Sequence, residues 1–134
     1  MPHLVILYTP NLEAECDLDA LCRALADAMR AVRDERDQPV FPTGGVRVLA
    51  YPAAHAAVAD GQRDYAFVYL NLRMARGRSE AVKKSAGEAL LAAARAHLAP
   101  LFARRYLGMT LQIDEGQEVF DAKHSTIHPL FRKD

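Results

Sequence analysis

Pro2, Arg47 and Arg78 are residues whose types suit acid–base chemistry on an acidic small molecule. Methionine is normally removed before a small second residue, which would leave a free secondary amine on Pro2. Arginines near such an amine would lower its pKa by charge repulsion, and an amine brought towards neutral pH is a good general base. Arginine also holds a carboxylate through two parallel hydrogen bonds. These residue types therefore favour proton transfer on a carboxylate-bearing substrate.

Each of the three residues also has a plain structural explanation. Many chains begin Met-Pro without consequence, so Pro2 alone is weak evidence. Arg78 comes just before a predicted helix, whose free amides and dipole would add to its charge in an anion site. Any single arginine can equally be a solvated surface charge. In its predicted strand, Arg73 falls between two residues of the apolar row, Leu72 and Met74. We assign it a structural or peripheral role.

The other reactive side chains do not form a recognisable motif. His124 and His128 are four residues apart, as two metal ligands on a helix would be. No third ligand lies near them in the sequence and Pro129 disfavours a regular helix, so we predict no metal site. Nucleotide-binding, nucleophile-elbow and paired CxxC motifs are absent. Cys16 and Cys22 are interpreted as free thiols that serve packing.

Length and composition favour a cytoplasmic protein with a single domain over residues 1–134. The 17 basic and 17 acidic residues balance, whereas a nucleic-acid-binding domain usually has a basic excess. The start lacks the pattern of a signal peptide. The most apolar stretch, residues 86–103, is interrupted by charged residues and a proline, so no membrane association is expected.

The hydrophobic pattern predicts two successive strand–helix–strand units. The strands are expected at residues 3–8, 46–51, 65–74 and 109–113, and the helices at residues 17–33 and from residue 79 onwards. Asp17 is suited to cap the first helix, and Pro100 is expected to kink or restart the second. The predicted fold is α+β, with a four-stranded sheet and two helices on one of its faces.

The third predicted strand is apolar on both faces. Tyr65, Phe67 and Tyr69 lead one row of side chains. The opposite row consists of Ala66, Val68, Leu70, Leu72 and Met74. Because two helices cover one face of a sheet, the other face is expected to be buried against further copies of the chain. The alternative is that the carboxy-terminal tail folds over it.

Five segments spread over nearly the whole chain form a recognisable set. They are Met1-Pro-His3 with its following strand, Gly45-Val-Arg47, the Ala-Asp-Gly-Gln-Arg-Asp-Tyr-Ala-Phe-Val run at 59–68, Gly77-Arg-Ser79, and Ile127-His-Pro-Leu-Phe131. Together they resemble the 5-carboxymethyl-2-hydroxymuconate Δ-isomerase family of the tautomerase superfamily. The resemblance extends from Pro2 to about Phe131.

The resemblance implies a tautomerase-like homotrimer without a cofactor, with active sites near subunit boundaries. It implies a role in the homoprotocatechuate branch of aromatic catabolism. Pro2 matches the family's catalytic proline, Arg47 the arginine of its Gly-Ile-Arg motif, and Arg78 the arginine of its Gly-Arg-Ser motif. Val46 replaces the isoleucine, and Leu49 stands where some relatives carry another basic residue. The number of substrate-binding cations therefore stays open.

The resulting hypothesis is an isomerase that converts the dienol 5-carboxymethyl-2-hydroxymuconate to its 2-oxo-3-ene isomer. Pro2 would act as the general base, and Arg47 and Arg78 would hold the substrate carboxylates. Two alternatives remain at this point. One is a tautomerase or dehalogenase that acts on another small acidic substrate, and the other is a non-catalytic trimer that binds acidic ligands.

Overall fold

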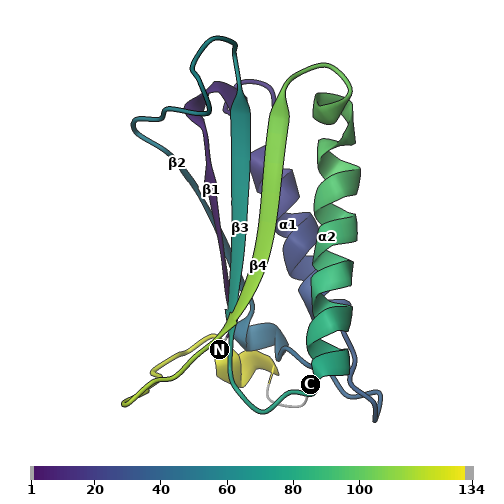
Figure 1. Cartoon of the computed structure of the whole chain (residues 1–134). Helices are drawn as coiled ribbons and strands as arrows, with labels where there is room; N and C mark the ends of the chain where they lie inside the picture. The colour runs from purple at the N-terminus through teal and green to yellow at the C-terminus, as the bar shows by residue number, and fades with distance from the viewer. Residues whose placement is uncertain (1, 132–134) are drawn as a thin grey trace.

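A four-stranded sheet with two helices on one face forms the fold (Figure 1). The strands are β1 (His3–Tyr8), β2 (Arg47–Pro52), β3 (Ala66–Met74) and β4 (Leu107–Glu115). The helices are α1 (Leu18–Ala31) and α2 (Glu80–Phe102), and the short 3-10 helices are η1 (Pro10–Leu12), η2 (Thr43–Gly45) and η3 (His128–Phe131). This computed structural model describes residues 2–131, so the expected removal of Met1 concerns a residue outside the described part. The α+β prediction is confirmed.

The strand order β2-β1-β3-β4 follows from the two strand–helix–strand units. Each unit pairs its own strands in parallel across a helical crossover, β1 with β2 and β3 with β4. The units join through the antiparallel pair β1 and β3. In this register His3 lies opposite both Arg47 and Arg73. The start of β1, the start of β2 and the end of β3 therefore meet at one end of the sheet.

The hydrophobic core fills the space between the sheet and the helices. Alternate strand residues point into it, because successive side chains of a strand face opposite sides. Each helix contributes the apolar stripe that its sequence predicts. The largest side chains with at most 1% exposure are Leu4, Ile6, Leu12, Leu21, Leu25, Met29, Val68, Leu70, Leu72, Leu90 and Leu98. The core thus fixes the strands, and with them the groups at their ends.

The beginnings of both long helices are capped by side chains. The Asp17 carboxylate accepts the backbone N–H of Ala20 at 3.0 Å, as the sequence predicts for α1. The Ser79 hydroxyl accepts the backbone N–H of Val82 at 3.2 Å at the start of α2. Because Ser79 directly follows Arg78, this second cap also fixes the backbone next to that arginine.

The predicted restart of the second helix at Pro100 is wrong, since α2 continues to Phe102. Pro100 is exposed and lies in the last turn, so its missing N–H removes a hydrogen bond where the helix is already ending. Leu98 and Leu101, at 0% and 4% exposure, pack into the core on either side of it. Their burial keeps the final turn helical.

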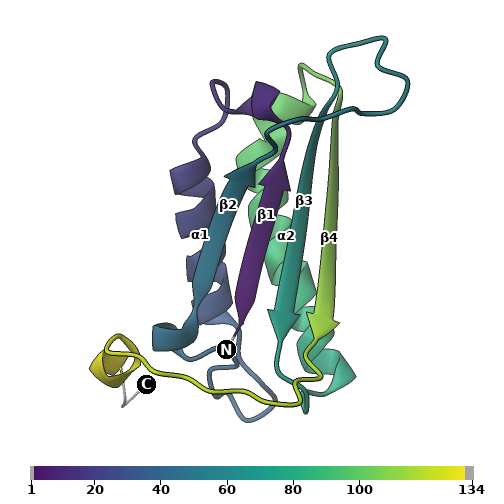
Figure 2. The same cartoon turned by 90° about the vertical axis from the view of Figure 1, so that its left-hand side faces the viewer.

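The sheet face away from the helices stays open (Figures 1 and 2). Leu7, Leu49 and Tyr51 lie on it and are each almost half exposed, at 46%, 46% and 48%. The carboxy-terminal segment crosses the end of the sheet near the N-terminus and does not run over this face (Figure 2). The alternative in which the tail covers the open face is therefore wrong for the isolated chain. Within residues 2–131, no helix has the length and apolar character needed to cross a membrane.

Candidate active site

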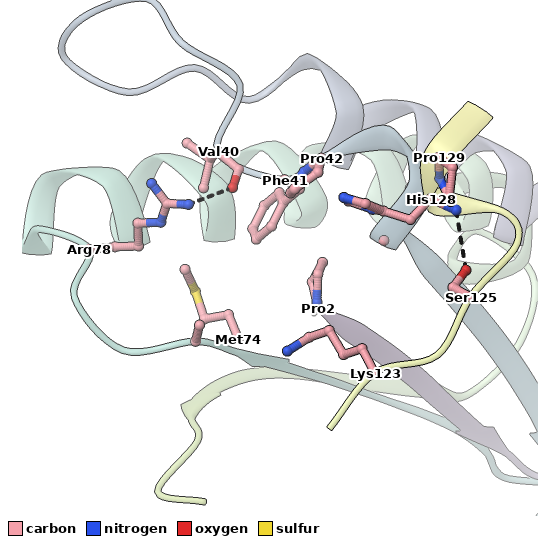
Figure 3. Close-up of a pocket in the computed structure, with 12 residues that line it drawn as sticks. Pro2, Val40, Phe41, Pro42, Met74, Arg78, Lys123, Ser125, His128 and Pro129 are labelled. Carbon is pink, nitrogen blue, oxygen red and sulfur yellow. Dashed lines mark hydrogen bonds between the residues drawn. The ribbon is translucent and has the colours of Figure 1, made fainter. Parts of the chain in front are cut away.

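A cavity of about 450 Å³ lies beside Pro2 at the end of the sheet (Figure 3). Pro2 is buried, and side chains such as Phe41 and Met74 contribute apolar surface to the cavity. The lining residues are Pro2, Val40, Phe41, Pro42, Gly45, Met74, Ala75, Arg78, Lys123, Ser125, His128 and Pro129. The structure thus brings together two of the predicted site residues, Pro2 and Arg78.

Arg78 reaches this cavity because of the turn that follows β3. Gly77 has φ of +106°, a conformation that side chains with a Cβ rarely adopt, and it turns the chain towards α2. The Arg78 guanidinium then donates a 2.9 Å hydrogen bond from Nη2 to the carbonyl of Val40 (Figure 3). A guanidinium has five N–H donors, and this bond uses one of them. The contact fixes the side chain and leaves capacity for a carboxylate.

The loop that carries Val40 is itself tied to the start of α2. The Ser79 hydroxyl donates a 2.6 Å hydrogen bond to Glu35, which lowers the pKa of that carboxyl group. The Asp34 carboxylate accepts the backbone N–H groups of Gln38 at 3.0 Å and Arg36 at 2.8 Å. These bonds lower the pKa of Asp34, and the charge of Arg78 adds to the effect. The hydrogen bonds of Arg78 and Ser79 therefore hold the loop with Val40, which forms one side of the cavity, against the start of α2.

Arg47 does not line the Pro2 cavity. It lies on the open face of the sheet, next to His3, and His3 lies next to Arg73. Burial lowers the pKa of His3, and the charges of Arg47 and Arg73 lower it further. Arg73 also forms an ion pair with Glu118 at 3.9 Å.

Arg47, His3 and Arg73 line a second cavity of about 390 Å³. It adjoins the Pro2 cavity, because the two share the lining residues Met74, Ala75, Lys123 and Ser125. The predicted arginines thus lie in neighbouring cavities, separated by the end of β3 and the tail.

Sequence reasoning missed the contribution of the carboxy-terminal segment. Lys123, Ser125, His128 and Pro129 form one wall of the Pro2 cavity (Figure 3). The Ser125 hydroxyl accepts the backbone N–H groups of Ile127 at 3.0 Å and His128 at 3.2 Å, which closes the turn before η3. The segment has no strand or helix periodicity, so the signal that could have drawn attention to it was the block at residues 127–131.

The two tail histidines lie in different cavities. His128 lines the Pro2 cavity, whereas His124 lines the neighbouring one. Over residues 2–131, no cluster of three His, Cys, Asp or Glu side chains is placed to hold a metal ion. Cys16 and Cys22 are free thiols, and burial raises the pKa of both. The Pro2 cavity is therefore lined by Pro2, by the cationic side chains of Arg78 and Lys123, by Ser125 and His128, and by apolar residues.

Comparison with known proteins identifies the family of this chain. The profile of the 5-carboxymethyl-2-hydroxymuconate isomerases matches residues 2–131. The chain belongs to this family. The isomerase is 30% identical to 5-carboxymethyl-2-hydroxymuconate Delta-isomerase of Escherichia coli over 132 residues, which is 98% of this chain and 100% of the relative.

Solved structures agree with this assignment. The isomerase is 58% identical to a crystal structure of a 5-carboxymethyl-2-hydroxymuconate delta-isomerase, with a TM-score of 0.94 over 98% of this chain and 93% of that one. A 5-carboxymethyl-2-hydroxymuconate isomerase from Deinococcus radiodurans R1 is 39% identical, with a TM-score of 0.86 over 98% and 94% of the two chains.

A more distant structure shows the fold alone. It is a fused 4-OT symmetric trimer that is 20% identical to the isomerase, with a TM-score of 0.58 over 98% of this chain and 99% of that one. The tautomerase-like fold prediction is confirmed by these neighbours.

Proposed function

We propose that this isomerase converts 5-carboxymethyl-2-hydroxymuconate, a dienol with three carboxylates, to its 2-oxo-3-ene isomer. It would do so in the cytoplasm, in the homoprotocatechuate branch of aromatic catabolism. The amino-terminal amine of Pro2 serves as the general base, and no metal or cofactor takes part. The observation that carries the proposal is the placement of buried Pro2 in one cavity with Arg78.

The reaction moves one proton along a conjugated system. The neutral amine of Pro2 takes the proton of the enol hydroxyl, and the negative charge spreads over the resulting dienolate. The protonated amine then returns the proton to a carbon at the far end of the conjugated system, so that no net proton is consumed. General acid–base catalysis of this kind contributes about two to four orders of magnitude.

The cavity supplies what the base and the anionic intermediate need. Burial and neighbouring cations both disfavour a charged amine, so they favour the neutral form of Pro2 at the pH of the cell. Arg78 holds a carboxylate and stabilises the dienolate charge. Apolar walls such as Phe41 and Met74 exclude water from the part of the cavity beside buried Pro2, which strengthens the electrostatic interactions there.

Arg47 takes part from the neighbouring cavity within a homotrimer. It lies at the end of the open sheet face, which exposes Leu7, Leu49 and Tyr51. Association of three copies through this face would bury these side chains and bring the cavity of Arg47 to a subunit boundary. Arg47 then binds a further substrate carboxylate there.

An assay of substrate turnover, with and without a metal chelator, tests the proposed reaction. Purified enzyme with a free Pro2 terminus is expected to ketonise 5-carboxymethyl-2-hydroxymuconate, and the loss of dienol absorbance measures the rate. Treatment with a chelator should leave the rate unchanged. Activity that disappears with the chelator and returns with zinc would contradict the proposed mechanism, and a protein that binds the dienol without turnover would be a binder.

Light scattering tests the assembly. The native species is expected to have three times the chain mass of 14.8 kDa. Leu49→Asp places a charge on the open face and should dissociate the trimer, because the buried carboxylate would lack a partner. Leu91→Asp is the matched control, since Leu91 is a 37% exposed residue of α2. A wild-type protein that is a stable, active monomer at micromolar concentration would rule the trimer out.

A further inference from the structure

Lys123 lies at the junction of the two cavities. It lines the Pro2 cavity that also contains Arg78, and it lines the neighbouring cavity that contains Arg47. Figure 3 shows its side chain extending alongside Pro2 on the cavity side. A ligand that reaches from Arg78 past Pro2 towards Arg47 would therefore pass the residues that line both cavities, and Lys123 is the cation among them.

The position of Lys123 depends on the way in which the tail docks against η2. A Cβ added at Gly44 would lie 2.7 Å from Cα of His128 and 3.3 Å from its carbonyl oxygen. Real Cβ atoms do not approach backbone atoms at 2.7 Å, so the tail can lie this close because residue 44 has no side chain. The buried Gly44 thus permits the close approach of His128, which lies in the same tail segment as Lys123.

The Lys123 side chain is held by an ion pair with Asp121, which also lines the second cavity, and it keeps N–H donors for a further anion. Its ammonium group donates a hydrogen bond to the Asp121 carboxylate, and this bond lowers the pKa of Asp121. A lysine ammonium has three N–H donors, and the bond to Asp121 uses one. The side chain is 47% exposed, so a ligand can reach it.

We propose that Lys123 is a third carboxylate-binding cation of the substrate site and that it determines the preference for three carboxylates over two. The inference rests on the proposed function, because that substrate carries three carboxylates and the sequence points to two cations, Arg47 and Arg78. Lys123 supplies the third at the place where the two cavities meet. The tail is then a wall of the site that selects the substrate.

Steady-state kinetics with two substrates test this role. The substrates are 5-carboxymethyl-2-hydroxymuconate, with three carboxylates, and 2-hydroxymuconate, with two. Lys123→Met keeps the length of the side chain and removes its charge. KM for the first substrate should rise about tenfold, as expected for one charge-assisted hydrogen bond at a half-exposed site, with kcat nearly unchanged. KM for the second should change less than about twofold.

Three further variants separate binding from general effects. Lys123→Arg should retain most of the preference because it keeps a cation. Lys84→Met is the matched control, since Lys84 lies on α2, 78% exposed and outside both cavities. Gly44→Ala should reproduce the loss of preference by displacing the tail. A melting curve of the Gly44→Ala protein shows whether it stays folded.

The outcomes distinguish this inference from the proposed function. If the wild-type protein turns over neither dienol, the proposed function fails, and calorimetric titration of the same two compounds into wild-type and Lys123→Met protein still decides the inference. A Lys123→Met protein that keeps the wild-type preference for three carboxylates, in turnover or in binding, overturns it. Loss of the preference in that variant alongside an unaffected Lys84→Met protein supports it.

Discussion

A chain that keeps Met1 is expected to lose almost all isomerase activity. An extra residue in front of Pro2 converts its amine into an amide, whose nitrogen is not basic at any pH of interest. Because general base catalysis contributes about two to four orders of magnitude, the rate should fall by at least about a hundredfold. The measurement compares turnover of preparations whose amino terminus has been verified by intact mass.

Enzymatic removal of the extra methionine provides the matched control for this experiment. The same preparation, treated with a methionine aminopeptidase, should regain full activity, since nothing but the terminus has changed. The pH–rate profile should show an ascending limb near neutrality when the terminus is free. A chain with intact Met1 that turns over substrate as fast as the processed form would end the hypothesis that Pro2 is the base.

A substitution at Pro2 tests the positioning of the same amine. Pro2→Ala keeps a terminal amine but makes it primary and frees its backbone torsion, because the proline ring no longer fixes φ. The amine is then held less well in the cavity that Met74 and Phe41 help to line. We expect this variant to lose much of its activity and to keep some, with the ascending limb of the profile still present.

The strands and helices that carry the site were predictable because the spacing of apolar residues along the chain distinguishes a strand from a helix. The apolar run of β1 and the stripe of α1 have periods that backbone geometry dictates, and their bounds differ from the predicted ones by two residues or fewer. Pro100 misled the prediction because its effect depends on its place in the last turn and on the burial of Leu98 and Leu101, which local sequence does not show.

The arrangement of the site was less predictable than its elements. Whether Arg47 faces Pro2 depends on the register between β1 and β2, and the sequence does not specify that pairing. In the observed register Arg47 lies beside His3, on the open face, whereas Pro2 lines the cavity beyond the strand end. Lys123 was missed because a contact between Gly44 and His128, far apart in sequence, places the tail.

Arg78→Ala is expected to reduce kcat/KM strongly while the protein stays folded. If the guanidinium binds a substrate carboxylate and the dienolate charge, its loss should cost about 2–4 kcal/mol of transition-state stabilisation, comparable to the loss of one oxyanion donor. Arg78 is exposed and lies outside the core, so the substitution removes little buried surface. It removes the 2.9 Å hydrogen bond to Val40, and we expect a small decrease in melting temperature.

Two further arginine variants show whether the effect belongs to the site. Arg78→Lys keeps a charge but loses the planar pair of donors, so its kcat/KM should lie between those of the wild type and Arg78→Ala. Arg76→Ala is the matched control, because Arg76 is also exposed and lines a different cavity, with Glu80 and Lys83. Its kinetics should stay close to wild type. Near-normal kcat/KM in a folded Arg78→Ala protein would mean that Arg78 is a surface charge, and the dienolate would then depend on Arg47 and Lys123 for its stabilisation.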